Sequence, residues 1–257
     1  MSTGIFPDRL KFSEVKPLFK KGEKTEFSNY HPISLLNSFS KIIEKIIYRR
    51  IYQHLTENNI LVQEQFGFRE KSSIDIATFA LLNTVLSSLD KKHFVGGVFC
   101  NLHKAFDCVN HNILLTKLGF YGISCIANQL MRSYLDHRYQ RVVINDNTNS
   151  KLTSECELVK HGVPQGSILG PLLFLIYIND LSKTLSSVAE LILFADDTSI
   201  VISNINSDEL TRNMNLVMKQ TINWFQSNLL SLNYIKNHLL QFRTKKTKGN
   251  EYPINGY

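Results

Sequence analysis

The chain has 257 residues, of which 43% are hydrophobic and 20% charged, and this composition excludes a disordered, collagen-like or coiled-coil protein. Lysine and arginine total 29 against 22 acidic residues, so the net charge of +7 is compatible with a polyanionic partner. No stretch approaches about 18 consecutive apolar residues, which argues against membrane insertion, and the four cysteines lack the spacing of a disulfide framework or a zinc site.

The first ninety residues predict an exposed segment followed by two helices. Residues 8–31 are rich in lysine and lack a regular apolar period, so we expect a basic loop there. Apolar residues then recur at helical spacing over residues 40–55, which predicts an amphipathic helix. A second helix is predicted over residues 76–89, with Ser72 and Asp75 as a capping box at its start.

The middle of the chain predicts a strand, two helices and a hairpin. Residues 94–100 are short, apolar and β-prone, which is typical of a buried strand. Helices are expected at residues 111–118 and from Ser124 onward, because a glycine-containing break separates two helical patterns. Residues 139–145 and 151–159 are expected to pair as strands across a polar connection.

The last third of the chain predicts a buried helix, a second hairpin and a further helix. Residues 167–181 are apolar on nearly all sides, as in a buried helix. Two apolar runs, residues 191–195 and 199–203, predict a hairpin with two adjacent acids at its tip. Residues 208–225 show another helical face. Strands separated by helices, with hairpins among them, predict an α+β layered fold.

The adjacent carboxylates Asp196 and Asp197 are the sharpest chemical feature of the sequence. Neighbouring acids repel each other, and the apolar runs on both sides raise the cost of ionising them. A bound divalent cation would offset that repulsion, and magnesium prefers one or two carboxylates completed by water and phosphate oxygens. The same dipeptide is typical of an ordinary β-turn, in which Asp bonds its own backbone, so the pair alone leaves both interpretations open.

Two further segments place polar groups beside apolar elements. Residues 161–167 contain two glycines, a proline and a glutamine directly before the predicted apolar helix. Glycines let a backbone approach a ligand, and a helix N-terminus offers free amides to a phosphate or a base, although an ordinary loop and cap would look the same. Residues 101–107 leave the end of a predicted strand, where sites in layered α/β proteins commonly lie.

Five segments in order resemble the reverse transcriptase domain of non-LTR (LINE-type) retrotransposons, most closely its jockey-like branch. Each segment alone is a weak signal, but the ordered set is specific, and the likeness extends from Phe6 to about Arg243. The segments are Asn29-Tyr30-His31-Pro32-Ile33-Ser34-Leu35-Leu36, Gln65-Phe66-Gly67-Phe68-Arg69, Lys104-Ala105-Phe106-Asp107, Gly162-Val163-Pro164-Gln165-Gly166-Ser167-Ile168-Leu169-Gly170-Pro171 and Phe194-Ala195-Asp196-Asp197.

The resemblance implies an α+β right-hand polymerase with palm and fingers, in which two Mg²⁺ ions, or Mn²⁺ in their place, join a primer 3′-hydroxyl to an incoming dNTP. Its partners would be an RNA template, a DNA primer and dNTPs. Binding to a membrane is not expected. The implied regions are an N-terminal and fingers region at 1–93, a palm with the remaining fingers elements at 94–243 and a basic tail at 244–257. Compared with the family, the thumb is largely missing and no endonuclease domain precedes the polymerase, so we expect a partial copy with a weak grip on duplex.

The resemblance also assigns roles to individual residues. Asp196 matches the principal metal ligand, and Asp197 stands beside it as a second. Phe106 matches the aromatic gate that crowds a ribose 2′-hydroxyl and so favours dNTPs. Gln165 and Gly166 match the loop beneath the template–nucleotide pair.

Two cationic side chains match functional positions of the family. Arg69 resembles the fingers arginine that faces the triphosphate, where a guanidinium can bind phosphate bidentately. Lys236 resembles the late palm lysine proposed to protonate the pyrophosphate leaving group. Taken singly, each would be interpreted as a solvated surface charge.

The chain departs from the family at one catalytic position. Asn101 stands where the family has the Asp that bridges the two metal ions, and an amide brings no negative charge to that role. Asp107 lies six residues further on and is present in the family as well, so it is not an obvious substitute. His31 stands in place of a fingers arginine. We therefore expect a severe loss of polymerase activity in this copy.

Three functions remain open at this point. An RNA-directed DNA polymerase domain would act with its RNA in the cytoplasm and on DNA in the nucleus. An RNA-dependent RNA polymerase shares the palm carboxylates, but Phe106 would penalise the 2′-hydroxyl that such an enzyme must accept. A non-catalytic nucleic-acid-binding remnant of a retrotransposon is favoured by Asn101 and by the missing thumb.

Overall fold

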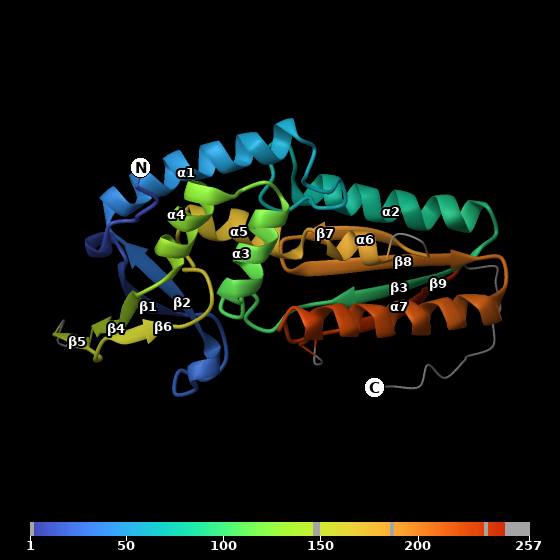
Figure 1. Cartoon of the computed structure of the whole chain (residues 1–257). Coiled ribbons are helices and arrows are strands. Elements are labelled where there is room, and N and C mark those ends of the chain that lie inside the picture. Colours follow the sequence, from blue (N-terminus) through green and yellow to red (C-terminus); the bar gives the residue numbers. More distant parts are fainter. Residues whose placement is uncertain (1–2, 146–149, 186–187, 234–235, 245–257) are drawn as a thin grey trace.

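Two separate β-sheets organise the chain in the computed structural model, which describes residues 3–145, 150–185, 188–233 and 236–244 (Figure 1). One sheet lies at the left of Figure 1 and the other at the right, with helices around and between them. The connection at 146–149 and the basic tail beyond residue 244 lie outside the described residues. No helix in the described part of the chain is long and apolar enough to cross a membrane.

The first sheet combines strands from the N-terminus and the middle of the chain. Its strands are β1 (Phe12–Phe19), β2 (Tyr30–Leu36), β4 (Arg138–Asn145), β5 (Lys151–Thr153) and β6 (Glu157–Val159). The order is β2-β1-β4-β5, and β6 also pairs with β4. Strand β4 pairs antiparallel with both β5 and β6, which confirms the predicted hairpin. Strand β1 runs parallel to β4 and so fixes the N-terminal segment to the middle of the chain.

The prediction of a loop for residues 8–31 is wrong. The structure has 3₁₀ turns at Asp8–Leu10 and Phe27–Asn29, with β1 between them. Ser13 and Val15 are buried on the same face of β1. Because one of the two inward positions is polar, the apolar alternation that normally identifies a strand is absent, and pairing with two neighbours stabilises β1 instead.

The second sheet carries the predicted acid-tipped hairpin. Its strands are β3 (Phe94–Cys100), β7 (Glu190–Phe194), β8 (Asp197–Asn204) and β9 (His238–Phe242). They are antiparallel in the order β7-β8-β3-β9. The strand and hairpin predicted from the apolar runs are confirmed. Strand β9 is not predicted by the sequence, because it lies at the sheet edge and none of its side chains is buried.

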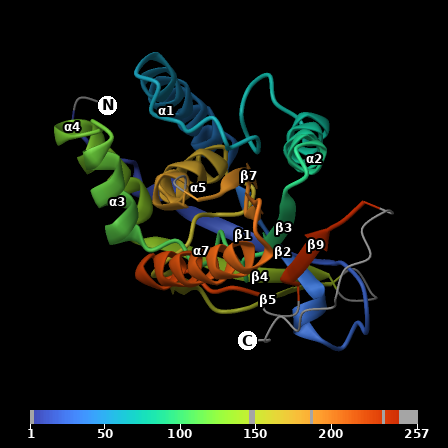
Figure 2. The same cartoon turned by 90° about the vertical axis from the view of Figure 1, so that its right-hand side faces the viewer.

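Helices α2 (Ile74–Asp90) and α7 (Ser207–Ser227) cover opposite faces of the second sheet (Figure 2). Side chains alternate between the faces along a strand. Val95 of β3 packs with the buried residues of α2, whereas a side chain at the next residue, Gly96, would meet α7. Both faces of the sheet are therefore covered by helices. A functional site is expected at the ends of its strands, which the helices do not cover.

Side-chain caps set the starts of the long helices. Asn37 precedes α1 (Ser38–Glu57), and its Oδ1 accepts a first-turn N–H at 2.8 Å. Ser73 precedes α2, and its Oγ accepts the Ile76 N–H at 3.3 Å. The cap is therefore Ser73 and not the predicted Ser72, a shift of one residue that leaves the predicted helix in place.

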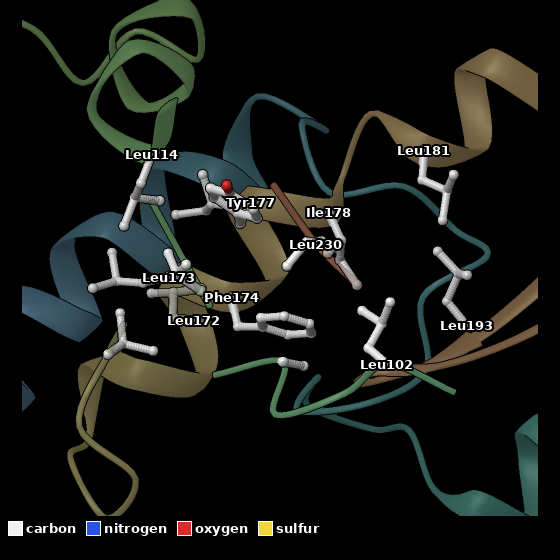
Figure 3. Packing of buried hydrophobic residues seen from close by; sticks show 14 of the residues in the cluster. Leu102, Leu114, Leu172, Leu173, Phe174, Tyr177, Ile178, Leu181, Leu193 and Leu230 are labelled. Atoms are coloured by element: carbon white, nitrogen blue, oxygen red, sulfur yellow. The ribbon is translucent and has the colours of Figure 1, made fainter. Parts of the chain in front are cut away.

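Helix α5 (Leu169–Ile178) forms the centre of the core between the two sheets. It is apolar and buried on nearly all sides, as predicted, and α3 (His111–Phe120), α4 (Cys125–Leu135) and α6 (Leu181–Leu185) complete the helical layer. Figure 3 shows five of its side chains, namely Leu172, Leu173, Phe174, Tyr177 and Ile178, in one cluster with residues from other parts of the chain, namely Leu102, Leu114, Leu181, Leu193 and Leu230. This core fixes the loops that leave β3 and precede α5.

Candidate functional site

The acidic turn between β7 and β8 is the centre of the candidate site. Phe194 pairs with Asp197, so only Ala195 and Asp196 lie between the strands, and Ala195 takes a left-handed backbone with a φ of 55°. Burial raises the pKa of the half-buried Asp196, and the charge of Asp197 raises it further. The charges of Lys236 and His31 act in the opposite direction. The turn therefore concentrates negative charge that needs cationic compensation.

Asn101 reaches the same turn from the neighbouring strand. Strand β3 runs antiparallel to β8 with Cys100 opposite Thr198, which places the next residue, Asn101, beside Asp197. The Asn101 Nδ2 donates a hydrogen bond to Asp197 Oδ1 at 2.7 Å. The predicted convergence of the strand ends is thus present. At this point, however, the chain presents an N–H group to the carboxylate rather than another negative oxygen.

The residues at the turn do not form a complete site for two metal ions. Among the described residues, no group of three or more His, Cys, Asp or Glu side chains could hold a metal ion. Asp196 and Asp197 suit one Mg²⁺ completed by water and phosphate oxygens. A bridging position between two ions requires a further carboxylate, and Asn101 lacks the charge for it.

The segment after α7 completes the site from the other side of Asn101. The Asn101 carbonyl accepts the Asn233 N–H at 2.8 Å, and the Asn101 N–H donates to Asn237 Oδ1 at 3.0 Å. Leu102 and Leu232 form a further antiparallel bridge. These contacts bring the exposed Lys236 close enough for its charge to lower the pKa of Asp196. The sequence does not reveal Asn233 and Asn237, because their contact with Asn101 depends on chain pairing over more than 130 residues.

The loop before α5 packs directly on the segment that follows β3. The Val163 N–H donates to the Phe106 carbonyl at 2.9 Å, and the Gly162 N–H donates to the Val109 carbonyl at 2.8 Å. The Gln165 Nε2 donates to Asp107 Oδ1 at 3.2 Å. The side chain of Asp107 therefore contacts Gln165, and whether Asp107 replaces the missing acid stays a prediction.

Gln165 and Gly166 also contact the first sheet. The Gln165 carbonyl accepts the Ser34 N–H at 2.7 Å. Gly166 has a φ of 111°, and a Cβ there would lie 2.6 Å from the Ser34 carbonyl oxygen, so glycine is required. A cavity of about 300 Å³ borders this loop, and its lining includes Asp107 and the buried Arg138. The motif at residues 29–36 and the loop before α5 thus form one structural unit.

Phe106 is held between two aromatic rings. It stacks on Phe174 of α5 with centroids 4.9 Å apart, and it meets Phe68 edge-on at 6.1 Å. Phe68 belongs to the Gln65–Arg69 motif, so two of the five family-like segments meet at this ring pair. Such packing orients a side chain that is proposed to act by its shape.

Arg69 is turned away from the acidic turn. Its Nη1 donates to the Val62 carbonyl at 2.5 Å and lies 3.4 Å from the Gln65 carbonyl. Arg69 also lines a separate cavity of about 470 Å³ together with Lys183. The structure therefore does not bring Arg69 together with the other predicted site residues, and its role toward a triphosphate stays a prediction.

Glu44 is a buried carboxylate that sequence reasoning missed. It contacts the backbone at the end of the loop before α5. Glu44 of α1 is fully buried, and its Oε2 accepts the Ile168 N–H at 2.7 Å. Its Oε1 accepts the hydroxyls of Tyr134 at 3.1 Å and Ser40 at 3.3 Å. The carboxylate faces the start of α5, where free backbone N–H groups favour an anion. Glu44 thus joins α1, α4 and the start of α5.

A comparison with protein families shows which family the chain belongs to. The model of the family described as Reverse transcriptase (RNA-dependent DNA polymerase) matches residues 19–250, which is most of the chain. The chain belongs to this family. Reverse transcriptases generally use divalent metal ions. The carboxylates of the acidic turn are the candidate ligands for such an ion in this reverse transcriptase domain.

Curated relatives of the reverse transcriptase domain come from Drosophila melanogaster mobile elements. A probable RNA-directed DNA polymerase from transposon BS is 30% identical over 242 residues, which cover 89% of this chain and 25% of the relative. The corresponding protein from transposon X-element is 32% identical, covering 76% and 21%. The RNA-directed DNA polymerase from mobile element jockey is 29% identical, covering 78% and 22%. The chain thus spans a quarter or less of these relatives, and the expected jockey-like character is confirmed.

Solved structures with the same fold include telomerases. Apo telomerase from Candida tropicalis, truncated from the C-terminal domain, superposes with a TM-score of 0.63 at 14% identity over 95% of this chain and 52% of that chain. Telomerase from Candida albicans in complex with a TWJ fragment of telomeric RNA gives 0.60 at 10% identity over 95% and 44%. The α+β right-hand polymerase fold expected from the sequence is confirmed.

Proposed function

We propose that the chain is the RNA-directed DNA polymerase domain of a non-LTR mobile element, with a palm that has lost one metal-binding carboxylate. The observation that carries this proposal is the 2.7 Å hydrogen bond from Asn101 to Asp197. It supports the assignment of residue 101 to the position of the bridging Asp, because that residue contacts one of the two acids. The amide donor of the same bond compensates part of the repulsion between the two acids.

The proposed substrates are dNTPs added to a DNA primer on an RNA template. Phe106 supports the choice of dNTPs, because a ring held by two aromatic neighbours can exclude a 2′-hydroxyl. Gln165 and Gly166 would lie beneath the template–nucleotide pair, and Lys236 would protonate the leaving pyrophosphate. Such an activity would meet its RNA in the cytoplasm and its DNA target in the nucleus.

The proposed metal requirement is two Mg²⁺ ions, with Mn²⁺ as the alternative, and the residues present do not fit both. Two bound ions would supply activation of the primer hydroxyl and neutralisation of the charge on the leaving phosphates. Asp196 and Asp197 can contribute to one such site, whereas Asn101 cannot bridge a pair. In this form the chain therefore keeps the fold and the nucleotide-facing residues without the full catalytic set.

The hydrogen bond between Asn101 and Asp197 also favours a second function, a non-catalytic domain that binds nucleic acid. The net charge of +7 supports binding to a polyanion. Binding of that kind should weaken steeply with salt, by a log–log slope of about −0.9 for each duplex phosphate neutralised. An RNA-dependent RNA polymerase is disfavoured by Phe106.

Primer extension with two nucleotide classes tests the proposed polymerase function. The chain carrying Asn101→Asp is expected to extend a DNA primer on an RNA template with dNTPs and Mg²⁺, and to use NTPs poorly. Preferential use of NTPs would support an RNA polymerase instead. Salt-sensitive binding without extension by the chain carrying Asn101→Asp would support the binding function.

A further inference from the structure

The side chain of Gln65 lies buried against the acidic turn. The segment around Gln65 pairs parallel with β7, where the Phe66 N–H donates to the Leu193 carbonyl at 2.7 Å. Only 3% of Gln65 is exposed. Its Oε1 accepts two backbone N–H groups, from Gly67 at 2.7 Å and from Ala195 at 3.1 Å. Gln65 therefore links the segment directly to the residue that precedes Asp196.

The turn needs such a partner because its backbone is strained and buried. Ala195 has a φ of 55°, a left-handed conformation that residues other than glycine adopt rarely. Ala195 is buried, so its N–H would carry a desolvation cost without an acceptor. The oxygen of Gln65 supplies that acceptor, and it does so without adding a third negative charge beside Asp196 and Asp197.

The approach of the segment is close enough to exclude any side chain at position 67. A Cβ on Gly67 would lie 2.2 Å from the Ala195 nitrogen, far inside van der Waals contact. Gln65 and Gly67 thus act together: the glycine lets the segment reach the turn, and the glutamine bonds to it. This contact explains why the Gln65–Arg69 motif contains Gln65 and Gly67, whatever the role of Arg69.

We propose that Gln65 is a positioning residue, which fixes the direction of the Asp196 carboxylate by holding the Ala195 N–H. The part of the proposal that concerns catalysis rests on the proposed polymerase function. The part that concerns the turn rests on the hydrogen bonds of Gln65 alone. Loss of the Gln65 acceptor should free the turn while the remaining fold stays intact, because the backbone pairing with β7 does not involve the side chain.

Asn179 provides a matched control for the effect of Gln65. Asn179 is 2% exposed, and its Oδ1 accepts the Val62 N–H at 3.0 Å while its Nδ2 donates to the Ile60 carbonyl at 2.8 Å. It thus anchors the same loop through a buried amide, but it does not contact the turn. Asn179→Leu should lower the stability of the domain as much as Gln65→Met does, without altering the turn.

Hydrogen exchange at the Ala195 amide is the first test and requires no catalysis. Gln65→Met, which has a similar shape but no acceptor, should speed exchange of this amide several-fold and up to about tenfold, as expected for one lost hydrogen bond. Gly67→Ala, which leaves Gln65 in place but crowds the turn, serves as a second variant if Gln65→Met does not fold, and should also speed exchange.

The kinetic test uses these variants in the chain that also carries Asn101→Asp. Gln65→Met should lower kcat for dNTP addition by about tenfold while KM for the primer–template stays within about twofold, because only the reacting geometry changes. Asn179→Leu should leave both constants unchanged at a temperature where the variant is folded.

Two results would overturn the proposal: unchanged exchange at Ala195 in Gln65→Met, or an equal increase in Asn179→Leu. If the chain with Asn101→Asp does not extend primers at all, the polymerase function fails, and the exchange of Ala195 alone decides whether Gln65 holds the turn.

Discussion

Replacing the buried carboxylate of Glu44 should destabilise the domain by an amount that depends on which contacts survive. Glu44 accepts the Ile168 N–H at 2.7 Å and the Tyr134 and Ser40 hydroxyls at 3.1 and 3.3 Å. Glu44→Gln keeps an oxygen for the backbone N–H and an amide that both hydroxyls can accept from. It removes the charge and reverses the two hydroxyl hydrogen bonds, so the hydrogen bonds near Glu44 become neutral pairs and the start of α5 loses a nearby anion.

These contacts set the expected magnitudes. Loss of charge assistance and of the favourable helix-end interaction should lower the free energy of unfolding by about 1–2 kcal/mol in Glu44→Gln. Glu44→Leu leaves one buried N–H and two hydroxyls without an acceptor, at about 1–3 kcal/mol each, so its loss should be at least about 3 kcal/mol. The ratio between the two variants is the informative quantity, because packing volume is similar in both.

Urea unfolding followed by circular dichroism measures both changes. With a slope of about 3 kcal/mol/M for a chain of this size, the midpoint should fall by about 0.5 M for Glu44→Gln and by about 1 M or more for Glu44→Leu. Glu57→Gln on the exposed end of the same helix is the control and should shift the midpoint by less than about 0.2 M. A midpoint for Glu44→Leu within 0.2 M (about 0.6 kcal/mol) of the unmodified chain would refute this account of the buried carboxylate.

Three further changes have direct outcomes. Phe106→Ala in the chain with Asn101→Asp should raise ribonucleotide incorporation relative to dNTP incorporation, measured by primer extension with competing nucleotides; an unchanged ratio would remove Phe106 as the gate. Gly166→Ala should lower the free energy of unfolding by more than about 1 kcal/mol, because its φ is 111° and its Cβ would lie 2.6 Å from a β2 carbonyl oxygen, and urea unfolding would show it. Burial raises the pKa of Cys100 to about 12, so this thiol stays protonated at pH 8 and iodoacetamide should label it only after unfolding, whereas the exposed Cys125 reacts in the folded chain; mass spectrometry of the labelled peptides distinguishes the two.

Local apolar patterns predicted the elements that bury a regular face. The strands on either side of Asp196 and the core helix α5 have runs of apolar residues, and burial is what those runs report. Strand β1 escaped prediction because Ser13 occupies an inward position, and β9 because it is an exposed edge. Their pairing is decided by distant partners, which a local pattern does not contain.

The candidate site divides in the same way. Asp196 stands out by its residue type, because two adjacent carboxylates suggest a metal site, whereas the predicted role of Phe106 comes from the family resemblance alone. The role of Gln65 could not be predicted, because it depends on a backbone N–H 130 positions away in the sequence. The sequence also does not predict that Arg69 points toward the Val62 carbonyl, because the direction of a side chain depends on the packing of the whole loop.

The central claim is that this reverse transcriptase scaffold lacks one catalytic carboxylate, and primer extension on an RNA template with dNTPs and Mg²⁺ tests it most directly. We predict no extension by the unmodified chain, extension by Asn101→Asp, and none by Asn101→Asp combined with Asp196→Ala. Extension by the unmodified chain that disappears on Asp196→Ala would contradict the claim, because it would show that the catalytic centre works with an amide at position 101.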